Sequence, residues 1–319
     1  MDKGSVEYAA MNNSSISVVI PSLNEDRETL SRVVDLLSSD PSVEEVIVVD
    51  DCSSTPLSLG NARVVRNSCR LGSAASRAAG IALAKSPVVL TTDAHVRFKT
   101  KGWGTQIADA IAANPKGIVC PSCLPVGDCS FRGKLYGGHL DSFSSRRGCP
   151  VVLESRWNSE TTANGMVGCA MGGAYAFDAS WNRKIGGYSG IKGCDPIELV
   201  SLSLKTRLSG GSIVVLPDIE MEHSFRKKPP FDVGCSRTAY NKMRLSFVAF
   251  PPEVSTIVPT LLVGSDGSVE AISEFMSDFG EIVSERDSFW GACGVDQEEA
   301  IKRAGIEFNI DIKARRVAT

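Results

Sequence analysis

The sequence predicts an α/β fold in which a Rossmann-like, mostly parallel central sheet is flanked by helices and followed by a small C-terminal appendage. Short apolar runs alternate with helix-spaced apolar residues over roughly the first 120 residues. The runs are continuously apolar, as in parallel strands that are buried on both faces. Polar clusters follow three of these runs, at the edge where such sheets bind ligands.

Local patterns place the individual elements. The expected strands are Ile16–Ile20, Val46–Val49, Arg63–Val65, Val88–Leu90, Ile118–Cys120, Met171–Phe177 and Ile213–Leu216. The expected helices are Glu28–Leu37, Ser73–Lys85, Ile107–Ala113, Pro196–Leu208, Val269–Phe279 and Gln297–Ala304. Residues 122–170, rich in Gly, Ser, Arg and Cys, indicate long loops with short strands. We expect a main domain over residues 1–250 and a helical appendage or extension over residues 251–319.

The composition is that of a globular protein without an obvious polyanionic partner. With 319 residues, of which 43% are apolar, the chain has ample material for a buried core. A formal net charge of −3 gives no overall attraction to nucleic acid or to an anionic membrane. The N-terminal residues lack a signal-peptide pattern, and no apolar run approaches the roughly 20 residues of a membrane span. We therefore expect a cytoplasmic protein with no membrane partner and with its ten cysteines reduced.

One group of cysteines allows a second interpretation. Cys120-Pro-Ser-Cys123, with Cys129 and His139 downstream, could form a zinc site. The spacing is irregular and no second pair follows, so small apolar residues at a strand end are the favoured interpretation.

Asp93-Ala94-His95, directly after an expected strand, is a candidate metal site. Residues two apart in an extended segment point to the same side, so both side chains can reach one ion. A carboxylate combined with imidazoles favours an ion such as Mn²⁺ (or Mg²⁺) over Ca²⁺. The alternative is an aspartate that caps a turn beside a surface histidine.

A second loop supplies complementary groups. His223 and Arg226 lie close together, and offer an imidazole for the ion and a guanidinium for phosphate oxygens. An ion in this place would neutralise the charge on the diphosphate that leaves a sugar nucleotide. The alternative for Arg226-Lys227-Lys228 is a solvated basic turn, which is favoured for the two lysines.

Three further pairs of residues suit a sugar nucleotide, and each also has a purely structural interpretation. Asp50 and Asp51 can accept from uracil or from ribose hydroxyls, or cap a helix. Gly172-Gly173 lets the backbone approach a sugar, or forms a tight turn. Asp195 and Glu198 can grip sugar hydroxyls from one helix face, or complement the helix dipole.

Together these stretches resemble, in order and over about 230 residues, the catalytic domain of the polypeptide N-acetylgalactosaminyltransferases, which has the GT-A fold, and more distantly the family 2 glycosyltransferases. The matching segments are Val18–Glu25, Val48–Ser53, Arg70–Gly72 with Arg77, Thr92–His95, Gly172–Asp178 with Gly186–Tyr188, Gly193–Glu198 and His223–Lys228.

The resemblance implies a role for each matching residue. The implied metal ligands are Asp93, His95 and His223, and the implied catalytic residues are Asp195, Glu198 and Arg226. The implied contacts with the UDP-sugar are Pro21, Asn24, Glu25, Asp50, Asp51, Arg70, Gly72, Arg77, Thr92, Gly172, Gly173 and Phe231. The sequence departs from the family where Lys192, Asp195, Pro196 and Phe231 replace a tryptophan, a glutamate, an asparagine and a tyrosine. The departures cluster on the donor-sugar and acceptor side.

The expected function is metal-dependent transfer of a sugar, GalNAc or a related hexosamine, from a UDP-sugar to a hydroxyl acceptor. The resemblance implies retention of anomeric configuration, whereas Asp195 as a base would allow inversion. A non-catalytic module that binds sugar nucleotides is an alternative, against which the intact Asp93, His95 and His223 argue. Dinucleotide and P-loop fingerprints are absent from the sequence.

The acceptor is a separate question. Residues 131–156 contain an excess of basic residues that could contact DNA phosphates, so a hydroxymethylated base in phage DNA is one expected acceptor. The basic residues are Arg132, Lys134, Arg146, Arg147 and Arg156, set against Asp141 and Glu154. The alternatives are that these charges are merely solvated, and that the acceptor is a protein Ser/Thr or a glycan.

Overall fold

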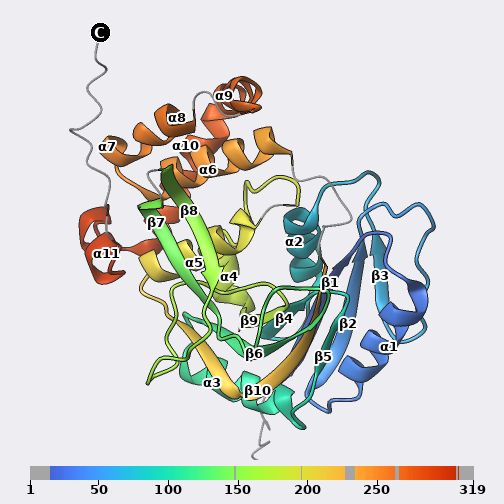
Figure 1. Cartoon of the computed structure of the whole chain (residues 1–319). Helices are drawn as coiled ribbons and strands as arrows, with labels where there is room; N and C mark the ends of the chain where they lie inside the picture. The colour runs from blue at the N-terminus through green and yellow to red at the C-terminus, as the bar shows by residue number, and fades with distance from the viewer. Residues whose placement is uncertain are drawn as a thin grey trace, which may run out of the picture.

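The computed structural model describes residues 15–146, 149–194, 196–226, 234–262, 266–306 and 308. An eight-stranded sheet lies at the centre of the molecule, and a group of helices packs above it in the view of Figure 1. The strand order is β3-β2-β1-β4-β9-β6-β10-β5. The predicted α/β fold with a mostly parallel central sheet is confirmed, because four of its pairings are parallel and three are antiparallel.

Apart from one short strand, β5, which was not predicted, the N-terminal half of the sheet follows the predicted alternation of strands and helices. Its elements are β1 (Ile16–Ser22), α1 (Arg27–Ser38), β2 (Val43–Asp50), β3 (Arg63–Arg66), α2 (Ser73–Leu83), β4 (Val88–Thr92), β5 (Val96–Phe98), α3 (Trp103–Ala113) and β6 (Ile118–Gly127). Strands β1, β2, β3 and β4 pair in parallel, so β1, β2 and β4 end at the same edge with the expected polar clusters.

The two faces of the sheet bury different side chains of the same strands. Val18 and Ile20 pack with the apolar face of α1 and with α3, whereas Val19 packs with α2. Leu30, Val33, Val34 and Leu37 are the buried residues of α1, as their spacing predicts. The sheet is therefore covered on both faces, which explains the continuously apolar strands.

The second half of the chain adds antiparallel strands and the remaining helices. Its elements are β7 (Gly138–Arg146), β8 (Cys149–Trp157), β9 (Ala174–Asp178), α4 (Ala179–Lys184), α5 (Ile197–Leu208), β10 (Ile213–Phe225), α6 (Cys235–Ala249), α7 (Pro252–Ser255), α8 (Ile257–Leu262), α9 (Ser268–Ser277), α10 (Phe279–Cys293) and α11 (Gln297–Arg303). Strand β9 is antiparallel to both of its neighbours, β4 and β6.

Three parts of this half differ from the expectation. The prediction of short strands in residues 122–170 is wrong, since β7 and β8 form an antiparallel hairpin with nine residues in each strand. Five helices, α4, α6, α7, α8 and α10, were not predicted; three of them are short, and the apolar residues of α6 and α10 do not form one continuous stripe. Strand β10 is also longer than Ile213–Leu216, and its extension carries His223.

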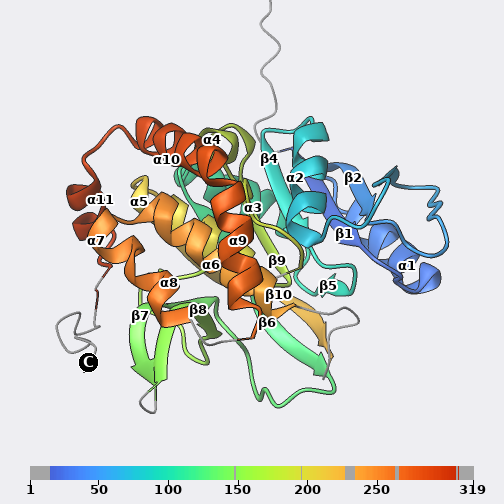
Figure 2. The ribbon, with the colours of Figure 1, turned by 90° about the horizontal axis from the view of Figure 1, so that it is seen from above.

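The C-terminal helices share the hydrophobic core of the sheet. Ala271 of α9 and Ile282 and Phe289 of α10 belong to the same buried cluster as Val19 and Val89. Seen from above, α9 and α10 lie beside α6 and α5 (Figure 2). In the described part of the chain, no helix is both long and apolar enough to cross a membrane.

Candidate active site

The polar clusters at the strand ends meet in space, as their positions predicted. Asn24, which follows β1 with φ 52°, is linked to the segment after β2, where its backbone N–H donates to Ser53 Oγ at 2.9 Å. Its side-chain oxygen accepts from the Ser54 N–H at 2.8 Å. Glu25 lies beside the segment after β4, with its Oε1 3.7 Å from His95 Nδ1. Pro21 lies in the last part of β1, next to this cluster.

Asp93, His95 and His223 form a group that can hold a metal ion. One potential ligand atom from each lies within 4.8 Å of the others. The rings of His95 and His223 are stacked with centroids 5.1 Å apart, and His223 Nε2 is 3.1 Å from Asp93 Oδ2. His223 reaches this position because β10 pairs antiparallel with β5, which places His223 opposite Val96.

The residues of this group fit a divalent cation. The Nδ1 atoms of His95 and His223 are buried and have no hydrogen-bond partner among the described residues. Buried nitrogens without a hydrogen bond are costly, so both imidazoles have unused capacity to bind a ligand. One carboxylate with two imidazoles is a donor set suited to Mn²⁺.

Asp93 is held as an anion by its surroundings. Burial by itself would raise the pKa of its carboxyl, but the hydrogen bond with His223 and the charge of Arg77 outweigh burial and hold the pKa well below its usual range. Arg77 Nη2 donates to Asp93 Oδ1 at 2.7 Å. An ionised, oriented carboxylate is the form that binds a cation.

Arg77 lies beneath the site, where its guanidinium connects three elements. It donates to Thr91 in β4, to Asp93 and to Glu198 in α5. Its side chain is only 5% exposed. The predicted nucleotide contact of Arg77 stays a prediction, because in this conformation its donors are directed to protein groups. The hydrogen bond from Arg77 orients the carboxylate of Asp93.

Glu25 and Arg226 pair at the rim of the site. Arg226 Nη2 donates to Glu25 Oε2 at 2.7 Å, and the Arg226 side chain is 39% exposed. Burial would raise the pKa of Glu25, but its interactions with His95 and Arg226 lower it below the ordinary value. Arg226 thus lies beside the metal group with part of its guanidinium open to solvent.

Asp50 and Asp51 are both buried and engaged within the protein. Asp50 accepts from the Ser53 N–H at 2.9 Å and pairs with Arg66. Asp51 accepts from the N–H groups of Leu71 and Gly72, each at 2.8 Å. The helix-capping interpretation of Asp50 is wrong, because a turn and then β3, and not a helix, follow it; Asp50 instead orders that turn, and Asp51 orders the turn before α2. Their predicted contacts with uracil or ribose stay predictions.

The Gly172-Gly173 segment is tied to the metal motif. The carbonyl of Gly173 accepts from Thr92 Oγ1 at 2.8 Å and from the Asp93 N–H at 2.9 Å. Gly173 has φ 113°, and a Cβ there would lie 2.5 Å from Met221 and 3.6 Å from the His223 ring. The glycine therefore lets β10 bring His223 close to Asp93.

A cavity of about 570 Å³ opens between the start of α2, the start of α6 and the segment before α5. Arg70, Gly72, Lys192 and Cys194 are among its lining residues. Glu198 lies behind this wall, where it accepts from Ser73 Oγ at 2.9 Å and pairs with Arg77. The predicted Asp195 and Phe231 lie outside the described residues.

The zinc interpretation of the cysteines is not supported. In the described ranges, the group of Asp93, His95 and His223 is the one with metal-binding geometry. Cys120 and Cys123 are buried, and burial raises the pKa of each thiol to about 12. His139 is half exposed and lies 3.1 Å from Asp141.

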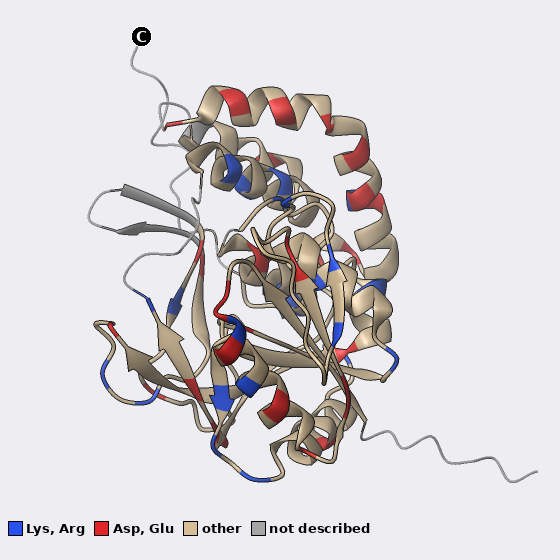
Figure 3. Cartoon of the chain, turned by 90° about the vertical axis from the view of Figure 1, so that its right-hand side faces the viewer, with Lys and Arg blue, Asp and Glu red and all other residues tan. Residues whose placement is uncertain are grey.

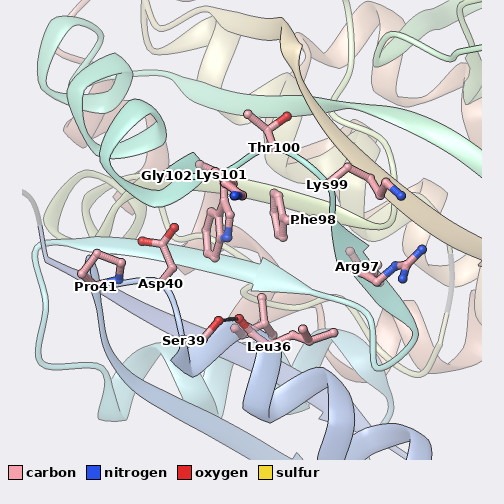
Figure 4. A pocket seen from close by; sticks show the side chains of 13 residues that line it. Leu36, Ser39, Asp40, Pro41, Arg97, Phe98, Lys99, Thr100, Lys101 and Gly102 are labelled. Carbon is pink, nitrogen blue, oxygen red and sulfur yellow. Dashed lines mark hydrogen bonds between the residues drawn. The ribbon is translucent and has the colours of Figure 1, made fainter.

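A separate cavity of about 290 Å³ lies between α1 and the β5–α3 connection (Figure 4). The rings of Phe98 and Trp103, which line it, are stacked with their centroids 4.0 Å apart. Arg97 and Lys99 extend away from Phe98 in Figure 4, and both pair with Glu222. None of the predicted site residues lines this cavity.

Sequence reasoning missed an aromatic cluster beside the metal group. The ring centroid of Phe225 lies 4.4 Å from that of His223, 4.9 Å from that of Phe131 and 5.9 Å from that of Trp157. The three rings come from separate segments, so no local pattern identifies them as neighbours. All three are partly exposed.

The chain has sequence and structural relatives. Polypeptide N-acetylgalactosaminyltransferase 4 of Caenorhabditis elegans is 28% identical over 247 residues, which cover 71% of this chain and 41% of the relative. A crystal structure of GalNAc-T7 with UDP, GalNAc and Mn²⁺ superimposes with a TM-score of 0.62 at 20% identity, covering 83% of this chain and 54% of that one. Staphylococcus aureus TarS 1-349 with UDP-GlcNAc gives a TM-score of 0.51 at 16% identity, with coverages of 91% and 81%. The chain spans about two fifths of the length of the curated relatives it matches.

The sheet, with the metal-capable group at its strand ends, is of the GT-A class of fold, as the structural likeness also shows. The chain belongs to glycosyl transferase family 2, whose model matches residues 17–180. The predicted resemblance to the catalytic domain of the polypeptide N-acetylgalactosaminyltransferases is confirmed.

Proposed function

We propose that the protein transfers a sugar from a UDP-sugar to a hydroxyl acceptor in a metal-dependent reaction. The observation that carries this proposal is the group of Asp93, His95 and His223, with Arg226 beside it. An ion site next to an accessible guanidinium suits a diphosphate leaving group.

The residues of the site have distinct tasks in this proposal. Asp93, His95 and His223 would hold Mn²⁺, which supplies positive charge that stabilises the departing diphosphate. Arg77 keeps Asp93 ionised and oriented. Arg226 exchanges its contact with Glu25 for a phosphate oxygen of the donor. The cavity lined by Arg70, Gly72 and Lys192 would take the remainder of the donor.

The donor sugar is a hexosamine in this proposal. The support is the identity of the relatives, which are named as N-acetylgalactosaminyltransferases, and the ligands of GalNAc-T7 and TarS, which are UDP with GalNAc and UDP-GlcNAc. Lys192 lines the donor cavity, at a position where the resemblance to the N-acetylgalactosaminyltransferases implies a tryptophan. We therefore expect the preferred sugar to differ from that of the related enzymes more readily than the binding of the metal and the diphosphate.

A UDP-release assay across donor sugars, with Mn²⁺ and with EDTA, tests the proposal. We expect turnover with UDP-GalNAc or UDP-GlcNAc that EDTA abolishes. Turnover that is independent of metal would refute it. The retaining outcome is tested by NMR of the product, since a β-linked product from a UDP-α-sugar would exclude retention.

The acceptor is proposed from the surface beside the metal group. The partly exposed rings of Phe131, Trp157 and Phe225 favour a protein or glycan acceptor, because aromatic rings stack on apolar faces. Two of the basic residues in the segment have acidic partners, and Arg147 lies outside the described residues. Lys134 pairs with Glu220, and Arg156 with Asp141. Transfer to hydroxymethylated DNA that falls steeply with salt would restore the DNA hypothesis.

A further inference from the structure

A cavity of about 290 Å³ lies between α10 and the segment formed by α4, the following turn and α5. It is separate from the metal group and from the donor cavity, with which it shares no lining residue. Lys205 of α5 and Arg244 of α6 line it, together with Arg183, Lys184 and the carboxylates Glu281 and Glu285. We infer that this cavity binds a small oxyanion of the phosphate type.

The first argument is an excess of buried positive charge. Lys205 and Arg244 are each only 1% exposed. Both pair with the same carboxylate, Glu285, whose side chain is 10% exposed. The other carboxylate that contacts Arg244 belongs to Glu281, which is 69% exposed and largely solvated. Two buried cations therefore share one buried anion, and a buried charge without compensation is costly.

The second argument is the unused donor capacity of Lys205. Its ammonium group has three N–H donors, and within the described residues Glu285 Oε1, at 2.9 Å, is the partner it contacts. Nζ lies 3.7 Å from where a Cβ of Gly186 would be, so the glycine leaves open space next to the ammonium group. A bound oxyanion would supply acceptors for the remaining donors.

The rim of the cavity adds to the positive field. Arg183 and Lys184, at the end of α4, are exposed, and neither has an ion-pair partner in the part of the chain that the structure describes. Ser189, Ser284 and Ser288 add hydroxyl groups that can donate to an anion. Four cations against two carboxylates leave a net charge of +2 around a cavity of this size.

The position of the cavity connects the site to other parts of the fold. Arg244 packs so closely under Gly190 that a Cβ there would lie 1.9 Å from its Nε. The segment from Gly186 to Gly190 continues directly into Ile191 and Lys192, which line the donor cavity. An anion in this cavity would therefore join α10 to α5 and to the segment that leads to the donor cavity.

Thermal unfolding of the full 319-residue chain in phosphate tests the inference. We expect inorganic phosphate to raise Tm in a concentration-dependent way, compared with sodium chloride of the same ionic strength, with EDTA present throughout. Lys205→Met should weaken the apparent phosphate affinity at least about tenfold, since it removes a charge-assisted contact. Lys205→Met leaves Arg244 to neutralise Glu285, so the variant keeps a paired carboxylate.

Two control variants make the result specific. Lys242→Met makes the same chemical change at another lysine, which is 13% exposed and pairs with Glu154, and should keep the phosphate response. Arg226→Gln should also keep it, because Arg226 belongs to the separate site proposed for the diphosphate. If Lys205→Met does not fold, the exposed double variant Arg183→Gln/Lys184→Gln should weaken the response instead.

Three outcomes would overturn the inference. Phosphate and chloride could stabilise the wild-type chain equally. The response could survive both Lys205→Met and the rim variant. It could also be lost in Arg226→Gln, which would assign phosphate to the donor site. None of these outcomes depends on sugar transfer, so they are distinguishable from a failure of the proposed function.

Discussion

The three histidines of the chain provide an internal test of the metal site. His223→Ala removes one of the three potential ligands, so we expect Mn²⁺-dependent turnover of a UDP-sugar to fall at least about 100-fold. His139→Ala is the matched control, because His139 lies on the β7–β8 hairpin and is half exposed. It should leave turnover within about twofold of the wild type. Equal losses in both variants would contradict the assignment of His223 as a metal ligand.

We expect replacement of Arg77 to lower the free energy of unfolding more than replacement of a surface arginine does, because Arg77 pairs with two carboxylates. Replacement by Met leaves Asp93 and Glu198 without their buried cation, and breaking a buried pair costs about 3–5 kcal/mol. Urea unfolding of Arg77→Met should show this loss. Arg32→Met is the control, since Arg32 pairs with Glu28 on the exposed surface of α1, and it should change the free energy of unfolding by less than about 1 kcal/mol. Similar values for both variants would contradict the role given to Arg77.

Among the elements, the start of α2 makes an unusually close approach to the segment before α5. Gly72 has φ 97°, and a Cβ there would lie 2.2 Å from the carbonyl carbon of Gly193. Gly72→Ala must therefore push apart two walls of the donor cavity, at a cost on the order of 1–3 kcal/mol, and should raise the donor KM. Gly60→Ala, with no atom within 4 Å of its Cβ, should leave both Tm and KM almost unchanged. The measurements are Tm and donor KM, and an unchanged KM in Gly72→Ala would place the donor elsewhere.

An ion pair joins helix α9 to Lys192, which lines the donor cavity. Lys192 Nζ lies 2.9 Å from Glu274 and also pairs with Asp278, and its backbone N–H and carbonyl are both held by Asn241 at 3.0 Å. The acidic residues of α9 and α10 lie above a helix with basic residues in Figure 3. The contact therefore fixes the segment that carries Lys192, which lines the cavity proposed for the donor.

This contact makes a pH-dependent contribution to stability. Burial opposes the shift for Glu274, but Lys192 and Arg237 lower its pKa, and the hydrogen bonds of Lys192 and Tyr240 lower that of Asp278. The contribution is thus fully present above the ordinary carboxyl values of 4.5 and 3.8, and is lost as the pH falls below them. Because the groups are partly solvated, it should be about 1 kcal/mol or less.

The check is Tm of the wild type and of Glu274→Gln/Asp278→Asn between about pH 7 and about pH 3. We expect the wild type to be the more stable at neutral pH and the difference to shrink as the pH falls toward the lowered pKa values of the two carboxyls. A difference that stays constant over this range would exclude the ion pairs as its cause.

At the scale of the whole molecule, the boundary predicted at residue 250 stays a proposal. The shared core and the ion pairs of Arg244 and Lys205 with α10 indicate that the C-terminal helices stabilise the rest of the chain. A chain ending at residue 250 would expose that apolar surface and leave two buried cations without a carboxylate. We expect it to be recovered mainly as insoluble protein. Recovery of a cooperatively folded, soluble 1–250 chain would instead support two independent domains. The cytoplasmic location and the reduced state of the cysteines also stay predictions.

The sequence by itself determined the α/β class, the strand ends where the polar clusters meet, and the metal motif of Asp93 and His95. These follow from local patterns, because strand burial and side-chain direction repeat every few residues. Only the tertiary structure decided the partners of Arg77, the hairpin of β7 and β8, and the ion pairs that join α9 and α10 to Lys192, Lys205 and Arg244. Those features join residues far apart in the chain, as in the pairs of Lys192 with Glu274 and of Arg77 with Glu198. No local period records such pairs, because their geometry exists only once the sheet and the helices have packed together.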